Sequence, residues 1–153
     1  MSETKTTVSL LQGIITDLNQ QADGHVIQSR IFSYQGLVKL AAKYASHAAE
    51  ERGYVEQCIN RILELGEVPQ NEKKEATPSY TDAVDYLKYD ETVSEKGLPE
   101  LYQAMEYVRD DPITYDLLKD YYIDEVKDLD WIKQQLALIS KIGPKNWYAA
   151  QME

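Results

Sequence analysis

Residues 67–81 read EVPQNEKKEATPSYT, a polar stretch that contains Pro69 and Pro78. On both sides of it, apolar residues recur in steps of three and four, the spacing that places side chains on one face of a helix. Helices are predicted over residues of about 4–35, 37–65, 82–109 and 112–142. A helix of about 25–30 residues is roughly 40 Å long, and about fifteen extended residues can span that length. The stretch is therefore predicted to cross over from the second helix to the third along the length of the bundle.

This connection determines the predicted topology. Helices that alternate up and down need only short loops, whereas one long crossover between two helix pairs is typical of the ferritin-like bundle. We predict an all-α fold, a left-handed ferritin-like four-helix bundle that forms a single domain over residues 1–153. Asp111-Pro112 supplies an N-cap and a first-turn proline for the fourth helix, and a short C-terminal helix is predicted over about 145–151. Pro99 lies within the third pattern, so that helix is either kinked or broken there.

Composition excludes several classes of function. The 153 residues carry a net charge of −10, which argues against nucleic-acid binding, because phosphate contacts need a basic face. The single cysteine, Cys58, excludes an intrachain disulfide and lies on an apolar stripe, where a buried, unreactive thiol is expected. Residues 1–7 are polar and lack an apolar signal region, and no apolar run approaches the roughly 18 residues of a membrane span. We therefore expect no membrane association and a cytoplasmic location.

Two glutamates occupy positions where the helical pattern calls for apolar residues. Glu51 completes the stripe of the second helix and Glu125 that of the fourth. The flanking stripe residues are Leu37, Ala41, Tyr44, Ala48, Val55, Cys58, Ile62 and Leu65, and Leu118, Tyr122, Leu129, Ile132, Leu136 and Ile139. A carboxylate on the core face of a helix is costly unless it is paired, protonated or bound to a metal. The two glutamates therefore predict a shared buried site.

Neighbouring positions extend this candidate site. Tyr54 and Asp128 lie three residues after the two glutamates, on the same helical faces. At the same level we expect Leu18 on the first helix and Ser94 on the third. The candidate metal residues are Glu51, Tyr54, Glu125 and Asp128, with Ser94 as a weak neutral ligand. Two alternatives remain open: carboxylates that are hydrogen-bonded or share protons without metal, and side chains that rotate towards solvent.

Both histidines are interpreted as structural residues. His25 lies two turns from Leu18 on the apolar stripe of the first helix, where a hydrogen-bonded core or interface histidine is expected. His47 is expected on the flank of the second helix. Neither histidine is assigned to the metal site.

Two runs of sequence resemble the bacterioferritins. They are Arg61–Pro69, RILELGEVP, and Leu129–Gly143, LDWIKQQLALISKIG, the second followed by Asn146, Trp147 and Tyr148. Weaker matches are Ser29-Arg30-Ile31-Phe32, Gly36-Leu37, Asp90, Gly97, Leu101 and Ala104. The resemblance covers nearly the whole chain. It implies a subunit of a hollow shell that oxidises Fe(II) at a di-iron centre within each subunit and stores a ferric mineral.

The same resemblance implies a defective centre. Bacterioferritins supply one Glu from each of the first and third helices and Glu-x-x-His from each of the second and fourth. The matching positions here are Leu18, Glu51, Tyr54, Ser94, Glu125 and Asp128, so four of the six differ from the family. The position of the family's haem-ligating methionine is Arg52, and haem is not expected. No catalytic residue is assigned, and ferroxidase activity of the conventional kind is not expected.

Three functions agree with the residues. The first is an iron-storage shell subunit that lacks a complete ferroxidase centre, as a homo-oligomer or co-assembled with a catalytic ferritin-like subunit. The second is a ferritin-like bundle with a structural or interaction role. The third is a remodelled site that binds iron or another divalent cation through Glu51, Tyr54, Glu125 and Asp128.

Overall fold

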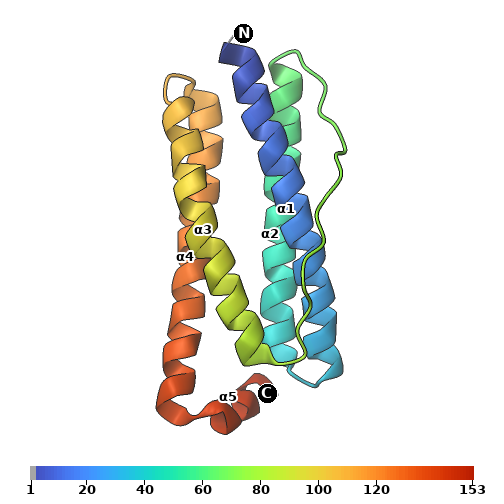
Figure 1. Cartoon of the computed structure of the whole chain (residues 1–153), viewed down its shortest axis with the longest axis vertical. Coiled ribbons are helices and arrows are strands. Elements are labelled where there is room, and N and C mark those ends of the chain that lie inside the picture. The colour runs from blue at the N-terminus through green and yellow to red at the C-terminus, as the bar shows by residue number, and fades with distance from the viewer. Residues whose placement is uncertain (1–2) are drawn as a thin grey trace.

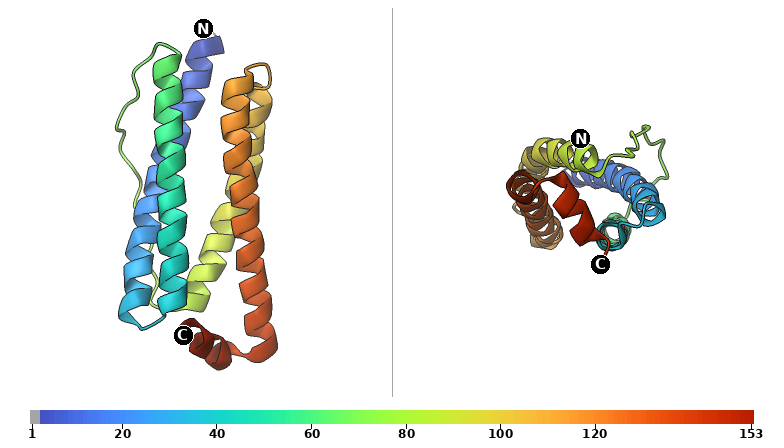
Figure 2. Two further views of the ribbon diagram at one scale, coloured as in Figure 1. Left: turned by 180° about the vertical axis from the view of Figure 1, so that it is seen from behind. Right: turned by 90° about the horizontal axis from the view of Figure 1, so that it is seen from below.

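The computed structural model describes residues 3–153 as four long helices and one short one. The helices are α1 (Glu3–Tyr34), α2 (Val38–Glu64), α3 (Ala83–Tyr107), α4 (Pro112–Ile142) and α5 (Pro144–Gln151). The long helices lie side by side as a bundle, and α5 lies across the end opposite the N-terminus (Figures 1 and 2). The predicted all-α ferritin-like bundle with a short C-terminal helix is confirmed.

Short turns hold the helices in two antiparallel pairs, α1 with α2 and α3 with α4. In the first turn Gly36 adopts a φ of 82°, which glycine reaches without a steric penalty. At the start of α4 the Asp111 carboxylate accepts hydrogen bonds from the Thr114 N–H and hydroxyl. The Arg61 guanidinium of α2 donates to both oxygens of that carboxylate, at 3.0 Å. One aspartate therefore caps α4 and fastens it to the end of α2.

Pro99 lies inside α3, which continues without a break from Ala83 to Tyr107. Figure 1 shows that α3 changes direction near its middle instead of ending there. Of the two outcomes predicted for this segment, the structure therefore has the continuous helix with a kink, as expected for an internal proline.

The crossover after α2 is pinned to α1 by glutamine side chains. The Gln12 amide donates to the Gln70 carbonyl at 2.9 Å and accepts from the Gln70 N–H at 2.7 Å. The Gln28 amide makes the same pair of bonds with the Tyr80 backbone, at 2.7 and 3.1 Å. Two further contacts come from Gln20, which accepts from Glu75 N–H, and Gln35, which donates to the Thr81 carbonyl. These bonds satisfy loop backbone groups and hold the loop along α1, as the figures show.

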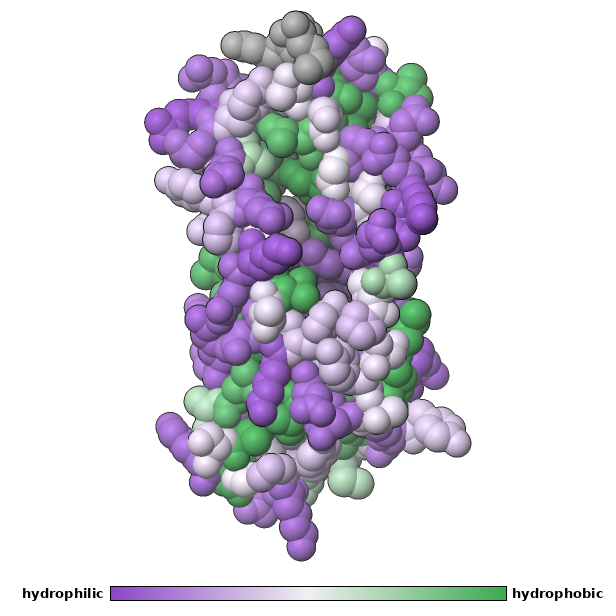
Figure 3. All heavy atoms as spheres, in the orientation of Figure 1, coloured by the Kyte–Doolittle hydropathy of each residue, from purple (hydrophilic) through white to green (hydrophobic). Residues whose placement is uncertain are grey.

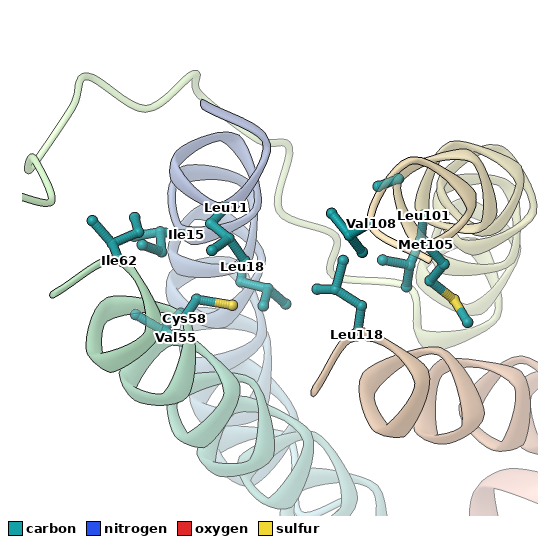
Figure 4. Packing of buried hydrophobic residues seen from close by; sticks show 11 residues of the cluster. Leu11, Ile15, Leu18, Val55, Cys58, Ile62, Leu101, Met105, Val108 and Leu118 are labelled. Atoms are coloured by element: carbon teal, nitrogen blue, oxygen red, sulfur yellow. The ribbon is translucent and has the colours of Figure 1, made fainter. Parts of the chain in front are cut away.

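The buried apolar residues form two clusters along the bundle. The first apolar cluster contains Leu11, Ile15, Leu18, Val55, Cys58, Ile62, Leu101, Ala104, Met105, Val108 and Leu118 (Figure 4). The second apolar cluster contains Phe32, Leu37, Leu40, Ala41, Tyr44, Ala83, Tyr86, Leu87, Ile132, Ile139 and Trp147. The predicted burial of Cys58 is confirmed. Along each long helix, the residues between the two clusters include ionisable side chains, and these form the candidate site.

The face of the molecule in Figure 3 is mostly hydrophilic, with small hydrophobic areas between hydrophilic side chains. Within residues 3–153, no helix combines the length and the apolar character that crossing a membrane requires.

Candidate functional site

Each long helix contributes an ionisable side chain to a polar layer between the two apolar clusters. The contributors are His25 from α1, His47 and Glu51 from α2, Asp90 from α3, and Glu125 and Asp128 from α4. They comprise four carboxylates and two imidazoles. We refer to these six residues as the polar layer.

His25 bridges two carboxylates at the centre of this layer. Its Nδ1 lies 2.7 Å from Glu51 Oε1, and its Nε2 lies 3.3 Å from Asp90 Oδ1. The second oxygen of Asp90 accepts a hydrogen bond from the Tyr44 hydroxyl at 3.0 Å. All four side chains are buried, so a continuous hydrogen-bonded chain links α2 through α1 to α3 and back to α2.

These carboxylates favour the charged form of His25. Burial by itself lowers the pKa of His25, but the Glu51 and Asp90 carboxylates outweigh it and hold the pKa well above its usual value. Burial raises the pKa of Glu51, and the neighbouring imidazolium partly opposes that rise. His25 is therefore an internal cation that balances part of the acidic charge in the core. The expected core histidine with hydrogen-bond partners is confirmed.

Asp90 was not predicted as part of the site. Steps of three and four connect Leu87 to Ser94 through either Asp90 or Glu91, so spacing alone fits both acidic residues. In the structure Asp90 is 6% exposed, whereas Glu91 is only partly buried. The signal was therefore present in the spacing but did not distinguish between two adjacent acidic residues.

His47 is buried, and the expectation that it lies on a helix flank is wrong. It is 4% exposed, because position 47 shares the core face with Tyr44 and Glu51, three residues before it and four after it. The ring packs edge-on against Tyr44 and Trp131, with centroids 5.3 and 5.8 Å apart. Burial, and then the charge on His25, lower the pKa of His47 to about 4. The imidazole is therefore neutral at pH 7.

One nitrogen of His47 has no hydrogen-bond partner among residues 3–153. This atom is Nε2, which is shielded from solvent and lies 3.3 Å from Asp128 Oδ1 without the alignment of a hydrogen bond. An unpaired polar atom in such a place is unfavourable, because it has lost its contacts with water and gained none in return. His47 Nε2 thus lies close to the Asp128 carboxylate of α4 but makes no hydrogen bond to it.

Burial and acidic neighbours disfavour the charged forms of the two carboxylates of α4. Glu125 and Asp128 are each partly buried, so the predicted burial holds fully for Glu51 and in part for Glu125. Burial first, and then the charges of Glu51 and Asp128, raise the pKa of Glu125 to about 8. Burial, followed by the charge on Glu50, raises the pKa of Asp128 to about 7. Both groups would be more stable beside an added positive charge than they are as free carboxylates.

Tyr54 has a partner outside the polar layer. Its hydroxyl donates a short hydrogen bond to the Asp124 carboxylate and a longer one, 3.4 Å, to the Asp120 carbonyl. Its ring lies 5.4 Å from that of Tyr121. The Tyr54 hydroxyl is thus bonded to Asp124 of α4, which is not one of the candidate metal residues.

The positions Leu18 and Ser94, which match family ligands, offer neither a carboxylate nor an imidazole. Leu18 is fully buried within the first apolar cluster, as Figure 4 shows, and Ser94 is 9% exposed. At the haem-ligand position, the Arg52 guanidinium binds Asn19 and Asp23 on α1. Within residues 3–153, no three His, Cys, Asp or Glu side chains already converge as a metal site.

Comparison with known proteins identifies relatives across most of the chain. Residues 8–142 match the family model described as a ferritin-like domain. The chain is 31% identical over 142 residues to the bacterial ferritin of Neisseria meningitidis serogroup B, covering 85% of this chain and 86% of that protein. It is 29% identical over 133 residues to the bacterial ferritin of Synechocystis sp., covering 85% of each. It is 25% identical over 153 residues to that of Pseudomonas aeruginosa, covering 95% and 96%.

Proposed function

The chain belongs to the ferritin-like family, and on that premise we propose that it is an iron-storage subunit without a complete ferroxidase centre. The iron is cargo in this proposal, not a resident cofactor. The bundle and its bacterial ferritin relatives support the storage role. The altered polar layer supports the loss of the conventional centre.

The burial of an aliphatic side chain at position 18 is the observation that best supports this proposal. The Leu18 side chain is fully buried and belongs to the first apolar cluster, at the position where bacterioferritins place a carboxylate. An aliphatic side chain supplies no metal ligand. Tyr54 is hydrogen-bonded to Asp124, and the third helix offers Ser94 in place of a glutamate. Two iron ions would therefore each lack donors that the family uses.

His25 supports the same conclusion from the charges. It lies between Glu51 and Asp90 and supplies positive charge inside the bundle. A buried ion pair with its hydrogen bonds satisfied tolerates the interior far better than a lone carboxylate does. We infer that this part of the core is stable without metal and that Glu51, Glu125 and Asp128, with Tyr54 at the edge, remain from an ancestral metal site.

We propose a hollow homo-oligomeric shell as the functional form, alone or co-assembled with a catalytic ferritin-like subunit. Haem is not part of the proposal, because Arg52 has no thioether to offer and is held by two side chains of α1. Oxidation of Fe(II) would then take place on the catalytic partner or on the growing mineral.

Size-exclusion chromatography with light scattering tests this function. The purified chain is expected to elute as a large multi-subunit particle, and, after aerobic addition of Fe(II), iron is expected to co-elute with it in excess of one ion per subunit. A monomer or simple dimer, or iron that elutes apart from the protein, would contradict the storage role.

A further inference from the structure

We propose that His47, Asp128 and Glu125 bind one divalent first-row transition-metal ion between α2 and α4. This site differs from the two-metal centre of the family, because it uses an imidazole one helical turn before Glu51 and a single ion. It goes beyond the storage role, since it lies within one subunit and would form whether or not a shell assembles.

The unpaired nitrogen of His47 is the first observation. The His47 side chain is 5% exposed, and its Nε2 has no hydrogen-bond partner within residues 3–153. A metal ion would use the lone pair of this neutral imidazole and remove the unfavourable state of a buried, unpaired nitrogen. Tyr44 and Trp131 pack against the ring and fix its direction.

The separation of two donor atoms is the second observation. His47 Nε2 and Asp128 Oδ1 are 3.3 Å apart but are not aligned as a hydrogen bond. Metal–nitrogen and metal–oxygen bonds are about 2.0–2.2 Å long, so two ligands of one tetrahedral or octahedral ion lie about 3.0–3.5 Å apart. The observed distance therefore matches the spacing of two neighbouring ligands of one ion.

Glu125 supplies the third ligand. It precedes Asp128 by three residues on the same face of α4, and α2 and α4 are in contact. Within the described chain the Glu125 carboxylate has no hydrogen bond or ion pair, so it is free to turn towards the ion. The three protein ligands do not yet converge, and a change of Glu125 rotamer with a water molecule would complete four-coordination.

Charge around the site favours a cation. His25 pairs with Glu51 and Asp90, whereas no lysine or arginine within residues 3–153 forms an ion pair with Glu125 or Asp128. The positive charge of Lys43 offsets part of the negative charge near Asp128. The Lys43 ammonium lies over the Trp131 ring, 5.0 Å from the centroid. The partial exposure of Asp128, 21% of the side chain, leaves a path for an ion from solvent.

The donor set restricts the kind of ion. Imidazole together with carboxylates suits Zn²⁺, Fe²⁺ or Mn²⁺, whereas Ca²⁺ and Mg²⁺ prefer oxygen donors alone. Zn²⁺ is the most convenient probe, because it is not oxidised during the measurement.

Titration calorimetry with ZnCl₂ on the metal-free protein at pH 7.5 tests the proposal. The wild type is expected to bind one Zn²⁺ per subunit, and His47→Gln and Asp128→Asn are expected to weaken this binding at least tenfold. Asp130→Asn is the matched control, because Asp130 is exposed on the same helix, and it is expected to bind as the wild type does. No saturable binding by the wild type, or unchanged binding by His47→Gln, would overturn the proposal.

Two further measurements keep the outcomes distinct. Far-UV circular dichroism in chelator establishes that each variant is folded, and if His47→Gln is not, Glu125→Gln with Asp128→Asn carries the test instead. Zn²⁺ is also expected to raise the melting temperature of the wild type but not of folded site variants. Light scattering on the same samples separates the two proposals: Zn²⁺ binding by a monomer contradicts only the storage shell, and a shell without Zn²⁺ binding contradicts only this site.

Discussion

His25 Nδ1 lies 2.7 Å from Glu51 Oε1 in the buried centre of the bundle, and the opposite nitrogen of the same ring faces Asp90. The imidazolium thus balances part of the acidic charge inside the bundle. Replacing only one member of such a buried arrangement leaves the other charges uncompensated, which is more damaging than replacing them together.

His25→Leu is expected to lower the free energy of unfolding at pH 7 by about 3–5 kcal/mol, because it leaves Glu51 and Asp90 buried without a cation. Urea denaturation measures the change. The double variant His25→Leu/Glu51→Leu is expected to lose less than the sum of the two single variants, because the second change removes one of the orphaned charges. Strict additivity would show that the two side chains are not coupled.

The glutamine contacts of α1 with the crossover predict how strongly they stabilise the fold and protect the crossover from proteolysis. Gln28→Ala removes two hydrogen bonds to the Tyr80 backbone and is expected to destabilise the protein by about 1–3 kcal/mol. It should also accelerate tryptic cleavage after Lys73 and Lys74, which lie in the crossover. Gln57→Ala on the exposed face of α2 is the control, and equal cleavage rates in the two variants would refute the role of Gln28.

Asp111 predicts an acid-dependent contribution to stability. Burial tends to raise its pKa, but the hydrogen bonds from Thr114 and Arg61 outweigh burial and place the pKa below its usual value of 3.8. A carboxylate whose pKa is lower in the folded state stabilises the fold above the unfolded-state pKa, and this stability is lost as pH falls through the folded-state pKa. The wild type is therefore expected to lose stability more steeply below pH 4 than Asp111→Asn does.

The same residue predicts a loss at neutral pH. Asp111→Ala removes the N-cap of α4 and the Arg61 contact, and we expect a loss of about 1–2 kcal/mol at pH 7. Asp110→Asn alters the exposed neighbour and serves as control in thermal and urea unfolding. Equal stability of Asp111→Ala and wild type would contradict the assigned role.

Much of the fold follows from sequence spacing. The crossover and the four stripes predict the bundle, because they determine which faces are apolar and how far each connection must reach. The N-cap at Asp111 is also evident from sequence, since an acidic residue before Pro112 is a typical helix start. The glutamine contacts are not, because they depend on where an irregular loop lies against α1.

The residues of the candidate site could be predicted only in part from sequence spacing. Spacing identified Glu51, Glu125 and Asp128 as sharing the core side of their helices, but it could not choose Asp90 over Glu91 or bring His47 into the core. Partner choice depends on rotamers and on neighbouring helices, which is why Tyr54 bonds to Asp124. Helical periodicity specifies the face of a residue, and packing decides its contacts.

Stopped-flow absorbance of Fe(II) oxidation in air tests most directly the proposed loss of a working two-iron centre. With increasing Fe(II) per subunit, the metal-free wild type is expected to show only slow oxidation, without a fast phase. A fast phase that saturates at two Fe(II) per subunit would contradict the account, because it would require a functional ferroxidase centre despite Leu18, Tyr54 and Ser94.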